Sequence, residues 1–199
     1  MMKKLLIATH NADKVKEIRG ILTGLDLILV TLDEAGSFPP TVEDAETLQG
    51  NALKKALEAF RATGIPAVAD DTGLEVFYLN DEPGAYSSRY AGPGATYASN
   101  RKKLLGTLRG VPPRRRAAQF RCVVAFVPAA GVHHLFEGRC QGVITEEESG
   151  DGGFGYDPIF LPDGFGETFG EMALDKKNTL SHRAHAFQAF AEFLRRGGW

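Results

Sequence analysis

The feature that most constrains the fold is a short apolar run near the start of the chain. Residues Leu5–Ala8 include no polar side chain, as is typical of a strand that is covered on both faces of a sheet. A polar segment, Thr9–Asn11, ends the run. Apolar residues then recur at helical spacing, at Val15, Ile18 and Leu22. A strand, a polar loop and a helix in this order predict an α/β fold.

The same alternation of strands and helices continues along the chain. Apolar patterns predict strands at residues 25–32, 65–69, 117–127 and 132–145, and helices that begin near Leu48, Thr96 and Ser181. The last two strands are separated by a short turn and form a hairpin. A stretch rich in Gly, Pro, Ser and Asn, residues 80–95, is the expected boundary between two lobes. We therefore expect one α/β domain, residues 1–199, with a mixed β-sheet and flanking helices.

The composition argues against several classes of partner. The chain has 23 Lys and Arg residues and 25 Asp and Glu residues, and its net charge of −2 offers no general attraction to nucleic acid or to a membrane surface. The arginine run Arg114–Arg116 could bind RNA, but no aromatic residues are interleaved with it. We expect these arginines to be exposed charges.

The cysteines and the N-terminus indicate a cytoplasmic protein. Cys122 and Cys140 are the only cysteines and form no C-x-x-C pair, so we expect both to fill the core in a reducing compartment. The apolar run at the N-terminus is shorter than the hydrophobic stretch of a signal peptide or a membrane span.

Residues Thr9–Lys14 form the first candidate binding segment. Because they lie between a strand and a helix, backbone N–H groups and the positive end of the helix dipole could meet phosphate oxygens there. Lys14 would add a full positive charge. The segment lacks the G-x-x-x-x-G-K-[ST] phosphate loop, and the alternative interpretation is a plain helix cap made by Asn11 or Asp13.

Two adjacent carboxylates, Asp70 and Asp71, follow the strand predicted at residues 65–69. At a strand end they would repel each other unless a cation or a proton shared their site, and Mg²⁺ with an activated water is the natural partner. The alternative is an ordinary Asp-rich turn. Glu43 and Asp44 favour the metal site because they supply further acidic oxygens from a loop just before the second helix.

Two further groups of residues could bind an anionic, flat ligand. Lys54 and Lys55 lie on the second helix and could neutralise a triphosphate, or could simply form a solvated helix face. Phe154 and Tyr156 stand in a glycine-rich segment that could approach a purine ring closely, with a structural turn as the alternative.

Several hydrogen-bond donors gather at residues 176–183, where we expect the last helix to begin. The dipole of a helix favours acidic residues at its start, so cations there indicate an anionic or carbonyl-rich ligand. His182 and His185 could instead ligate zinc, but no third ligand accompanies them at a suitable spacing.

Five sequence blocks together carry a family resemblance. They are T-H-N-A-D-K, V-E-D-A-E-T-L-Q-G-N-A-L-K-K-A, A-D-D-T-G-L-E-V, G-G-F-G-Y-D-P-I-F and K-N-T-L-S-H-R. In this order they cover nearly the whole chain and resemble the inosine triphosphate pyrophosphatase family, also described as XTP/dITP diphosphatases. The resemblance implies an elongated α/β fold whose two lobes enclose a central cleft, and a homodimer. It also implies Mg²⁺-dependent hydrolysis of ITP, dITP and XTP to nucleoside monophosphate and pyrophosphate, which cleanses the nucleotide pool.

The resemblance further implies roles for individual residues. Glu43 and Asp71 would hold the metal, and Asp71 would be catalytic because it would accept the proton of the water that attacks the α-phosphorus. The substrate-binding residues would be Thr9, His10, Asn11, Ala12, Asp13, Lys14 and Lys55 at the triphosphate, Thr72 facing the substrate, Phe154, Gly155, Tyr156 and Asp157 as the base platform, and Lys177, His182 and Arg183 around the purine edge. Two positions depart from the family pattern. His10 stands where glycine is common, and Gly50 replaces a frequent glutamate, which puts a metal role at that position in doubt.

Base discrimination would depend on the six-position of the purine. The keto oxygen of inosine or xanthosine would pair with His182 or Arg183, whereas the amino group of adenine would leave these donors unpaired, at a cost of about 1–3 kcal/mol per group. Guanine carries the same keto oxygen, so its exclusion needs another feature. One alternative is a related pyrophosphatase for modified pyrimidine nucleotides, although a serine- and arginine-rich N-terminal segment would be expected there. Another is a nucleotide-binding regulator that does not hydrolyse its ligand. The presence of all three acids, Glu43, Asp70 and Asp71, argues against this alternative.

Overall fold

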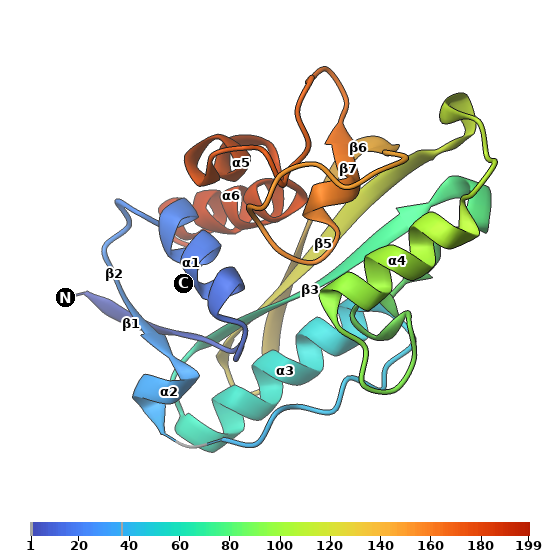
Figure 1. The fold of residues 1–199 in the computed structure, drawn as a ribbon. Helices are drawn as coiled ribbons and strands as arrows, with labels where there is room; N and C mark the ends of the chain where they lie inside the picture. Colours follow the sequence, from blue (N-terminus) through green and yellow to red (C-terminus); the bar gives the residue numbers. More distant parts are fainter. Residues whose placement is uncertain (1, 37) are drawn as a thin grey trace. The chain divides into compact units, whose positions relative to one another are not determined.

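The computed structural model describes residues 2–36 and 38–199. The strands are β1 (Lys3–Ile7), β2 (Leu27–Thr31), β3 (Ala67–Val76), β4 (Glu82–Gly84), β5 (Ala117–Ala129), β6 (Val132–Ile144) and β7 (Phe160–Pro162). The α-helices are α1 (Ala12–Ile21), α2 (Leu32–Ala35), α3 (Leu48–Thr63), α4 (Tyr97–Thr107), α5 (Leu174–Leu180) and α6 (His182–Arg195). Figure 1 shows this arrangement, which confirms the predicted α/β class.

The strands form a mixed sheet, as predicted. They hydrogen-bond in the order β2-β1-β3-β5-β6-β7, and β4 pairs with β3. β1 runs parallel to both β2 and β3, whereas β4 is antiparallel to β3 and β7 is antiparallel to β6. Residues 130–131 link β5 to β6, so the predicted hairpin is confirmed.

The chain divides into two compact units. Unit 1 comprises Met1–Asp71, Cys122–Gly138 and Arg183–Trp199, and unit 2 comprises Thr72–Arg121 and Arg139–His182. The boundary expected at residues 80–95 is therefore wrong, because the chain passes from one unit to the other within β3, β5 and β6 and at the start of α6. Residues 80–95 are rich in turn formers because they surround β4 and a short 3₁₀ helix inside unit 2.

Unit 1 has a hydrophobic core between its strands and two of its helices. α1 and α6 pack on one face of β1 and of the first part of β3 (Figure 1), and their shared core includes Leu5, Ile18, Val68, Phe126 and Phe187. Cys122 is a free cysteine in this core, as predicted. α3 begins at Leu48, as predicted, and its apolar residues Leu48, Ala52 and Ala56 are buried. This burial of apolar surface is the main source of stability for such an arrangement.

Unit 2 has a second core, which includes Leu74, Leu104, Cys140, Phe160 and Phe169. α4 runs along the second part of β3 (Figure 1) and begins at the predicted cap, Thr96, which forms a capping box with Ser99. Arg116, expected to be exposed, is instead buried, because its guanidinium donates hydrogen bonds to three backbone carbonyls.

Two short helices depart from the predictions. The strand expected at residues 25–32 ends at Thr31, because Thr31 and Glu34 form a capping box that starts α2. α5 precedes the last helix, so Lys177 lies on α5 and not at the start of α6. Among the residues that the structure describes, no helix has the length and apolar composition needed to cross a membrane.

Candidate active site

Asp70 and Asp71 lie inside β3, and the prediction that they end a strand is wrong. The strand continues to Val76, and successive strand residues point to opposite faces of a sheet. Their carboxylates accordingly have separate partners: Asp71 contacts residues of α3, and Asp70 contacts residues of α1 and α6. The two acids have different direct contacts and can carry different tasks, although Lys14 and Lys55 act electrostatically on both.

Asp71 forms the centre of the first cluster, in unit 1. Its Oδ1 lies 3.0 Å from Nζ of Lys55, and the same nitrogen lies 2.7 Å from Oε1 of Glu43. The two predicted metal ligands thus converge on one cationic atom. Burial raises the pKa of Asp71, and the lowering effects of Lys55 and Lys14 do not cancel it. A carboxylate with a raised pKa is a better proton acceptor than an ordinary aspartate.

Asn51 is a member of this cluster that the sequence reasoning missed. It is fully buried on α3, its Nδ2 donates to Oδ2 of Asp71 at 3.2 Å, and its Oδ1 accepts from the N–H of Ala45 at 3.0 Å. One side chain therefore ties the loop that carries Glu43 to β3. The sequence could have indicated this role, because Asn51 lies directly beside the buried apolar stripe of α3. A buried asparagine there needs polar partners.

Gly50, which departs from the family pattern, has a packing role. A Cβ at this position would lie 2.7 Å from Cβ of Ala45 and 3.2 Å from Oγ1 of Thr47. A side chain would therefore push away the loop that precedes α3 and carries Glu43. The glycine lets this loop pack closely against the first turn of the helix.

The residues present fit a divalent cation. Mg²⁺ is usually held by one or two carboxylates together with substrate phosphates and waters. Glu43 and Asp71 supply two carboxylates, and the ammonium group of Lys55 between them stands in for a positive charge. Within residues 2–36 and 38–199, no group of three or more His, Cys, Asp or Glu side chains is placed to hold an ion. The other ligands would have to come from a bound substrate and from water.

Asp70 forms the centre of a second, buried cluster in unit 1. Its Oδ2 lies 3.0 Å from Nζ of Lys14 and 3.0 Å from Nη2 of Arg183, and Nη1 of Arg183 lies 2.6 Å from Oε2 of Glu17. Burial alone would raise the pKa of Asp70, but Lys14, Arg183 and Lys55 outweigh it and hold this pKa well below its usual range. Removing one partner from such a buried group costs about 3–5 kcal/mol.

Arg183 and His182 have different surroundings although they are neighbours in the chain. Arg183 is 1% exposed and belongs to unit 1, where Asp70 and Glu17 are its ion-pair partners. His182 belongs to unit 2, where its ring stacks on Phe120 at a centroid distance of 4.5 Å. Their roles at the purine edge stay predictions.

In the segment Thr9–Lys14, the predicted helix cap is confirmed, because Asn11 caps α1. Oδ1 of Asn11 accepts from the N–H groups of Asp13 and Lys14, at 2.9 Å and 3.2 Å, and Oγ1 of Thr9 accepts from the N–H of Asn11. The exposed residues of the segment are His10, Ala12 and Asp13. The N–H groups of Asp13 and Lys14, which could have met phosphate, thus already have an acceptor. The side chain of Lys14 is therefore the main positively charged group that this segment offers.

In unit 2, the glycine-rich segment is built around Asp157. The carboxylate of Asp157 accepts from the N–H of Phe154 at 2.7 Å and from Nζ of Lys177 at 2.5 Å. Gly153 has a φ of 67°, and a Cβ there would lie 2.2 Å from Oδ2 of Asp157, so only glycine fits. Nζ of Lys177 also lies 4.9 Å from the ring centroid of Phe154. Asp157 and Lys177 are therefore a buried frame that fixes the ring of Phe154.

The two aromatic residues of the predicted platform differ in exposure. Phe154 is half-buried, whereas Tyr156 is 4% exposed, belongs to the core of unit 2 and donates its hydroxyl to the carbonyl of Ser87 at 2.9 Å. The exposed ring of Tyr97, at the start of α4, lies 6.0 Å from that of Phe154 and was not foreseen as a site residue. The other predicted positions in this unit, Thr72 and Gly155, are half-buried.

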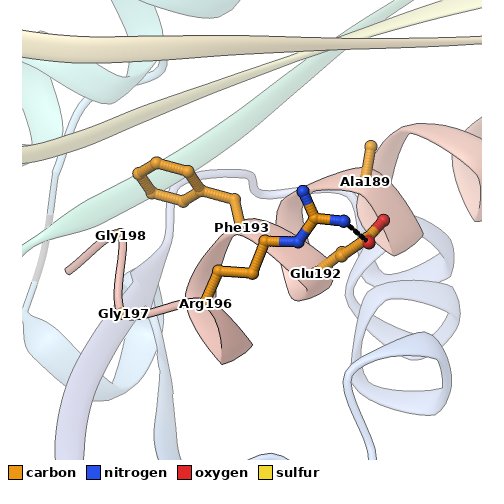
Figure 2. Close-up of a pocket in the computed structure, with 6 residues that line it drawn as sticks. All are labelled: Ala189, Glu192, Phe193, Arg196, Gly197 and Gly198. Carbon is orange, nitrogen blue, oxygen red and sulfur yellow. Dashed lines mark hydrogen bonds and ion pairs between the residues drawn. The ribbon is translucent and has the colours of Figure 1, made fainter.

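A surface hollow near the C-terminus is separate from these clusters. It has a volume of about 410 Å³ and is lined by Ala189, Glu192, Phe193, Arg196, Gly197 and Gly198 (Figure 2). Arg196 and Glu192 form an ion pair at its side. None of the predicted site residues lines this hollow.

Comparison with known proteins decides the family. The sequence model of the Ham1 family matches residues 5–193. The chain belongs to the Ham1 family. A relative from Geobacter sulfurreducens, named dITP/XTP pyrophosphatase, is 43% identical and covers 100% of this chain and 98% of its own. A relative of the same name from Porphyromonas gingivalis is 47% identical, with 97% and 98% covered. The family predicted from the five sequence blocks is thus confirmed.

Solved structures of Ham1 proteins share the fold. A HAM1 protein from Coxiella burnetii aligns with a TM-score of 0.88 at 36% identity, over 98% of this chain and 100% of that chain. The Ham1 protein of Staphylococcus aureus aligns with a TM-score of 0.86 at 34% identity, over 98% and 100%. The α/β architecture described above is therefore that of the Ham1 family.

Proposed function

We propose that this Ham1 protein hydrolyses non-standard purine nucleoside triphosphates, namely ITP, dITP and XTP, to the nucleoside monophosphate and pyrophosphate, and so cleanses the nucleotide pool. The observation that carries the proposal is the convergence of Glu43 and Asp71 on one cationic nitrogen, that of Lys55. Relatives that share 43–47% of the sequence over nearly its whole length bear the name dITP/XTP pyrophosphatase. Carboxylates such as these are the protein groups that usually hold the metal ion in a metal-assisted phosphate hydrolysis.

Glu43 and Asp71 would hold Mg²⁺ in this enzyme. When bound, the ion supplies Lewis acidity and offsets the negative charge of the phosphate oxygens. The fit rests on the donor set, which is two carboxylates with a cation already accommodated between them.

The residues of unit 1 would perform the remaining tasks around the phosphates. Asp71 would accept the proton of the attacking water on a carboxylate oxygen. Asn51 would hold the carboxylate in place through its hydrogen bond to Oδ2. Lys55 and Lys14 would bind phosphate oxygens and stabilise the charge of the departing pyrophosphate.

The residues of unit 2 would bind the base. The purine would stack on the half-exposed ring of Phe154, which the Asp157–Lys177 pair holds in place. His182 would contact the six-keto oxygen, as the family resemblance implies. The homodimer is a proposal that rests on the same resemblance, and the cytoplasmic location is a proposal that rests on the cysteine content.

A substrate panel tests this function. Pyrophosphate release from dITP, ITP and XTP should exceed release from ATP, GTP, dUTP and dTTP in the presence of Mg²⁺. A preference for dUTP or dTTP would instead support the modified-pyrimidine alternative. Binding without release of pyrophosphate from any nucleotide would support a non-hydrolysing regulator.

A further inference from the structure

The position of Lys55 has a consequence for the order in which ligands bind. Its Nζ lies 2.7 Å from Glu43 and 3.0 Å from Asp71, and its side chain is only 11% exposed. The ammonium group therefore occupies the point on which both carboxylates converge. A divalent cation that used both carboxylates would need the same point.

The two cations exclude each other for electrostatic reasons. Mg²⁺ ligands lie at about 2.0–2.1 Å, so an ion held by both carboxylates would be within close range of an ammonium group that kept its present hydrogen bonds. At such separations the repulsion between cations is large in a partly buried site. Lys55 has a long, flexible side chain, so its ammonium group can leave if another anion receives it.

The phosphates of a nucleotide are such an anion. The two carboxylates together carry a charge of about −2. One ammonium group and one divalent cation together carry more positive charge than this. The negative charges of bound phosphate groups would offset the excess. The nucleotide can thus draw Lys55 away from the carboxylates and leave them to the cation.

We propose that Lys55 blocks the divalent-cation site of the free protein and that bound phosphate groups release it, so that the cation binds with the nucleotide and not before it. This inference rests on the proposed function, because it takes Glu43 and Asp71 as the cation ligands. Linkage requires the effect to be reciprocal, so phosphate and cation strengthen each other's binding.

The neighbouring residue provides a matched control. Nζ of Lys54 lies 2.6 Å from Oδ1 of Asp44 and 2.8 Å from the carbonyl of Val42, and it contacts neither proposed ligand in any hydrogen bond described. Lys54→Met removes the same charge from the same helix as Lys55→Met. It therefore separates the blocking effect from a general change in charge.

The test measures Mn²⁺ binding to the full chain without nucleotide, with electron paramagnetic resonance as the readout. Lys55→Met should bind Mn²⁺ at least about tenfold more tightly than the unaltered protein, and Lys54→Met should differ from it by less than about twofold. Lys55→Gln serves as a second variant, and circular dichroism checks that each variant is folded. Equal Mn²⁺ affinity in the unaltered protein and in both Lys55 variants would overturn the proposal.

A second measurement uses the unaltered protein. Pyrophosphate, added with correction for the Mn²⁺ that it binds in solution, should tighten Mn²⁺ binding by about tenfold, and this coupling should be weaker in Lys55→Met. Coupling of equal size in both proteins would contradict the blocking role. Pyrophosphate release from dITP by the unaltered protein is measured in parallel. If that release is intact while the Mn²⁺ results fail, only this inference is lost; if release is absent, the proposed function fails.

Discussion

Replacing Asn51 by alanine tests whether one buried amide holds the acidic cluster together. The change removes the acceptor of the Ala45 N–H and the donor to Oδ2 of Asp71. Each polar group that loses its partner costs about 1–3 kcal/mol, so the two groups together should lower the free energy of unfolding by about 2–6 kcal/mol. For a chain of this size, 1 kcal/mol shifts Tm by about 2–4 °C, so Tm should fall by about 4–24 °C.

Activity should fall more than stability alone explains. With Asp71 no longer fixed by Asn51, misplacement of the carboxylate should lower kcat for dITP by about 10- to 100-fold. The assays are thermal unfolding by circular dichroism and steady-state release of pyrophosphate well below the Tm of the variant. KM should change much less than kcat, because Asn51 holds the proton acceptor and contacts no predicted base residue.

A buried asparagine in unit 2 provides the control. Oδ1 of Asn100 accepts from the N–H of Ala91 at 2.7 Å, and its Nδ2 donates to the carbonyls of Ser87 and Ser88. Asn100→Ala should therefore lose similar stability and keep kcat within about threefold. If Asn51→Ala kept kcat as well as Asn100→Ala does, Asn51 would be structural only. If neither variant lost stability, the reasoning about buried hydrogen bonds would be refuted.

Four further predictions concern the two clusters, the base segment and the core of unit 2. Asp71→Asn should lower kcat by about 100-fold or more with little change in nucleotide affinity measured without a divalent cation, and equal loss of both would contradict its role as proton acceptor. The pKa of Asp70 lies well below its ordinary value of 3.8, so Asp70 contributes stability above pH 3.8 that is lost as the pH falls further. The difference in unfolding free energy between the unaltered protein and Asp70→Asn should therefore shrink below about pH 4; a constant difference from pH 7 to pH 3 would count against it. Phe154→Ala should raise KM for dITP about tenfold, whereas Tyr156→Phe should keep KM and lose about 1 kcal/mol of stability, and the reverse pattern would remove Phe154 from the base site. Burial raises the pKa of Cys140 to about 11, so Ellman's reagent at pH 8 should react with it slowly until the protein unfolds, and rapid reaction in the folded protein would contradict this placement.

The helices near the N-terminus could be predicted because local patterns determine them. The cap at Asn11 and the face of α3 at Ala52 and Ala56 follow from residue types and spacing within a few positions. The short helix α2 was missed because four residues are too few for a periodic pattern to be seen.

The surroundings of Asp70 could not be predicted, because they depend on contacts between distant parts of the chain. Its partner Arg183 is 113 residues away, and Lys14 lies on a different helix. Without these partners, two consecutive acids look like a turn, whereas with them the strand continues through both. The unit boundary was missed for a similar reason, since the long strands β3, β5 and β6 pass from one hydrophobic core to the other without a change in composition.

The candidate site residues were found mainly through the family resemblance, but the structure alone assigns their partners. The sequence offered no sign that Lys55 bridges Glu43 and Asp71, or that Asn51 fixes them. Side chains on α3 and on the loop before it could pair in several ways. Which of them pair depends on which polar groups are buried and therefore need a partner.

The most direct test of the central claim identifies the products formed from dITP and XTP by phosphorus NMR, in the presence and in the absence of Mg²⁺. The account predicts a nucleoside monophosphate and pyrophosphate in equal amounts, only when the divalent cation is present, with ATP consumed far more slowly. Formation of a nucleoside diphosphate and orthophosphate, or equal turnover with and without the cation, would contradict it.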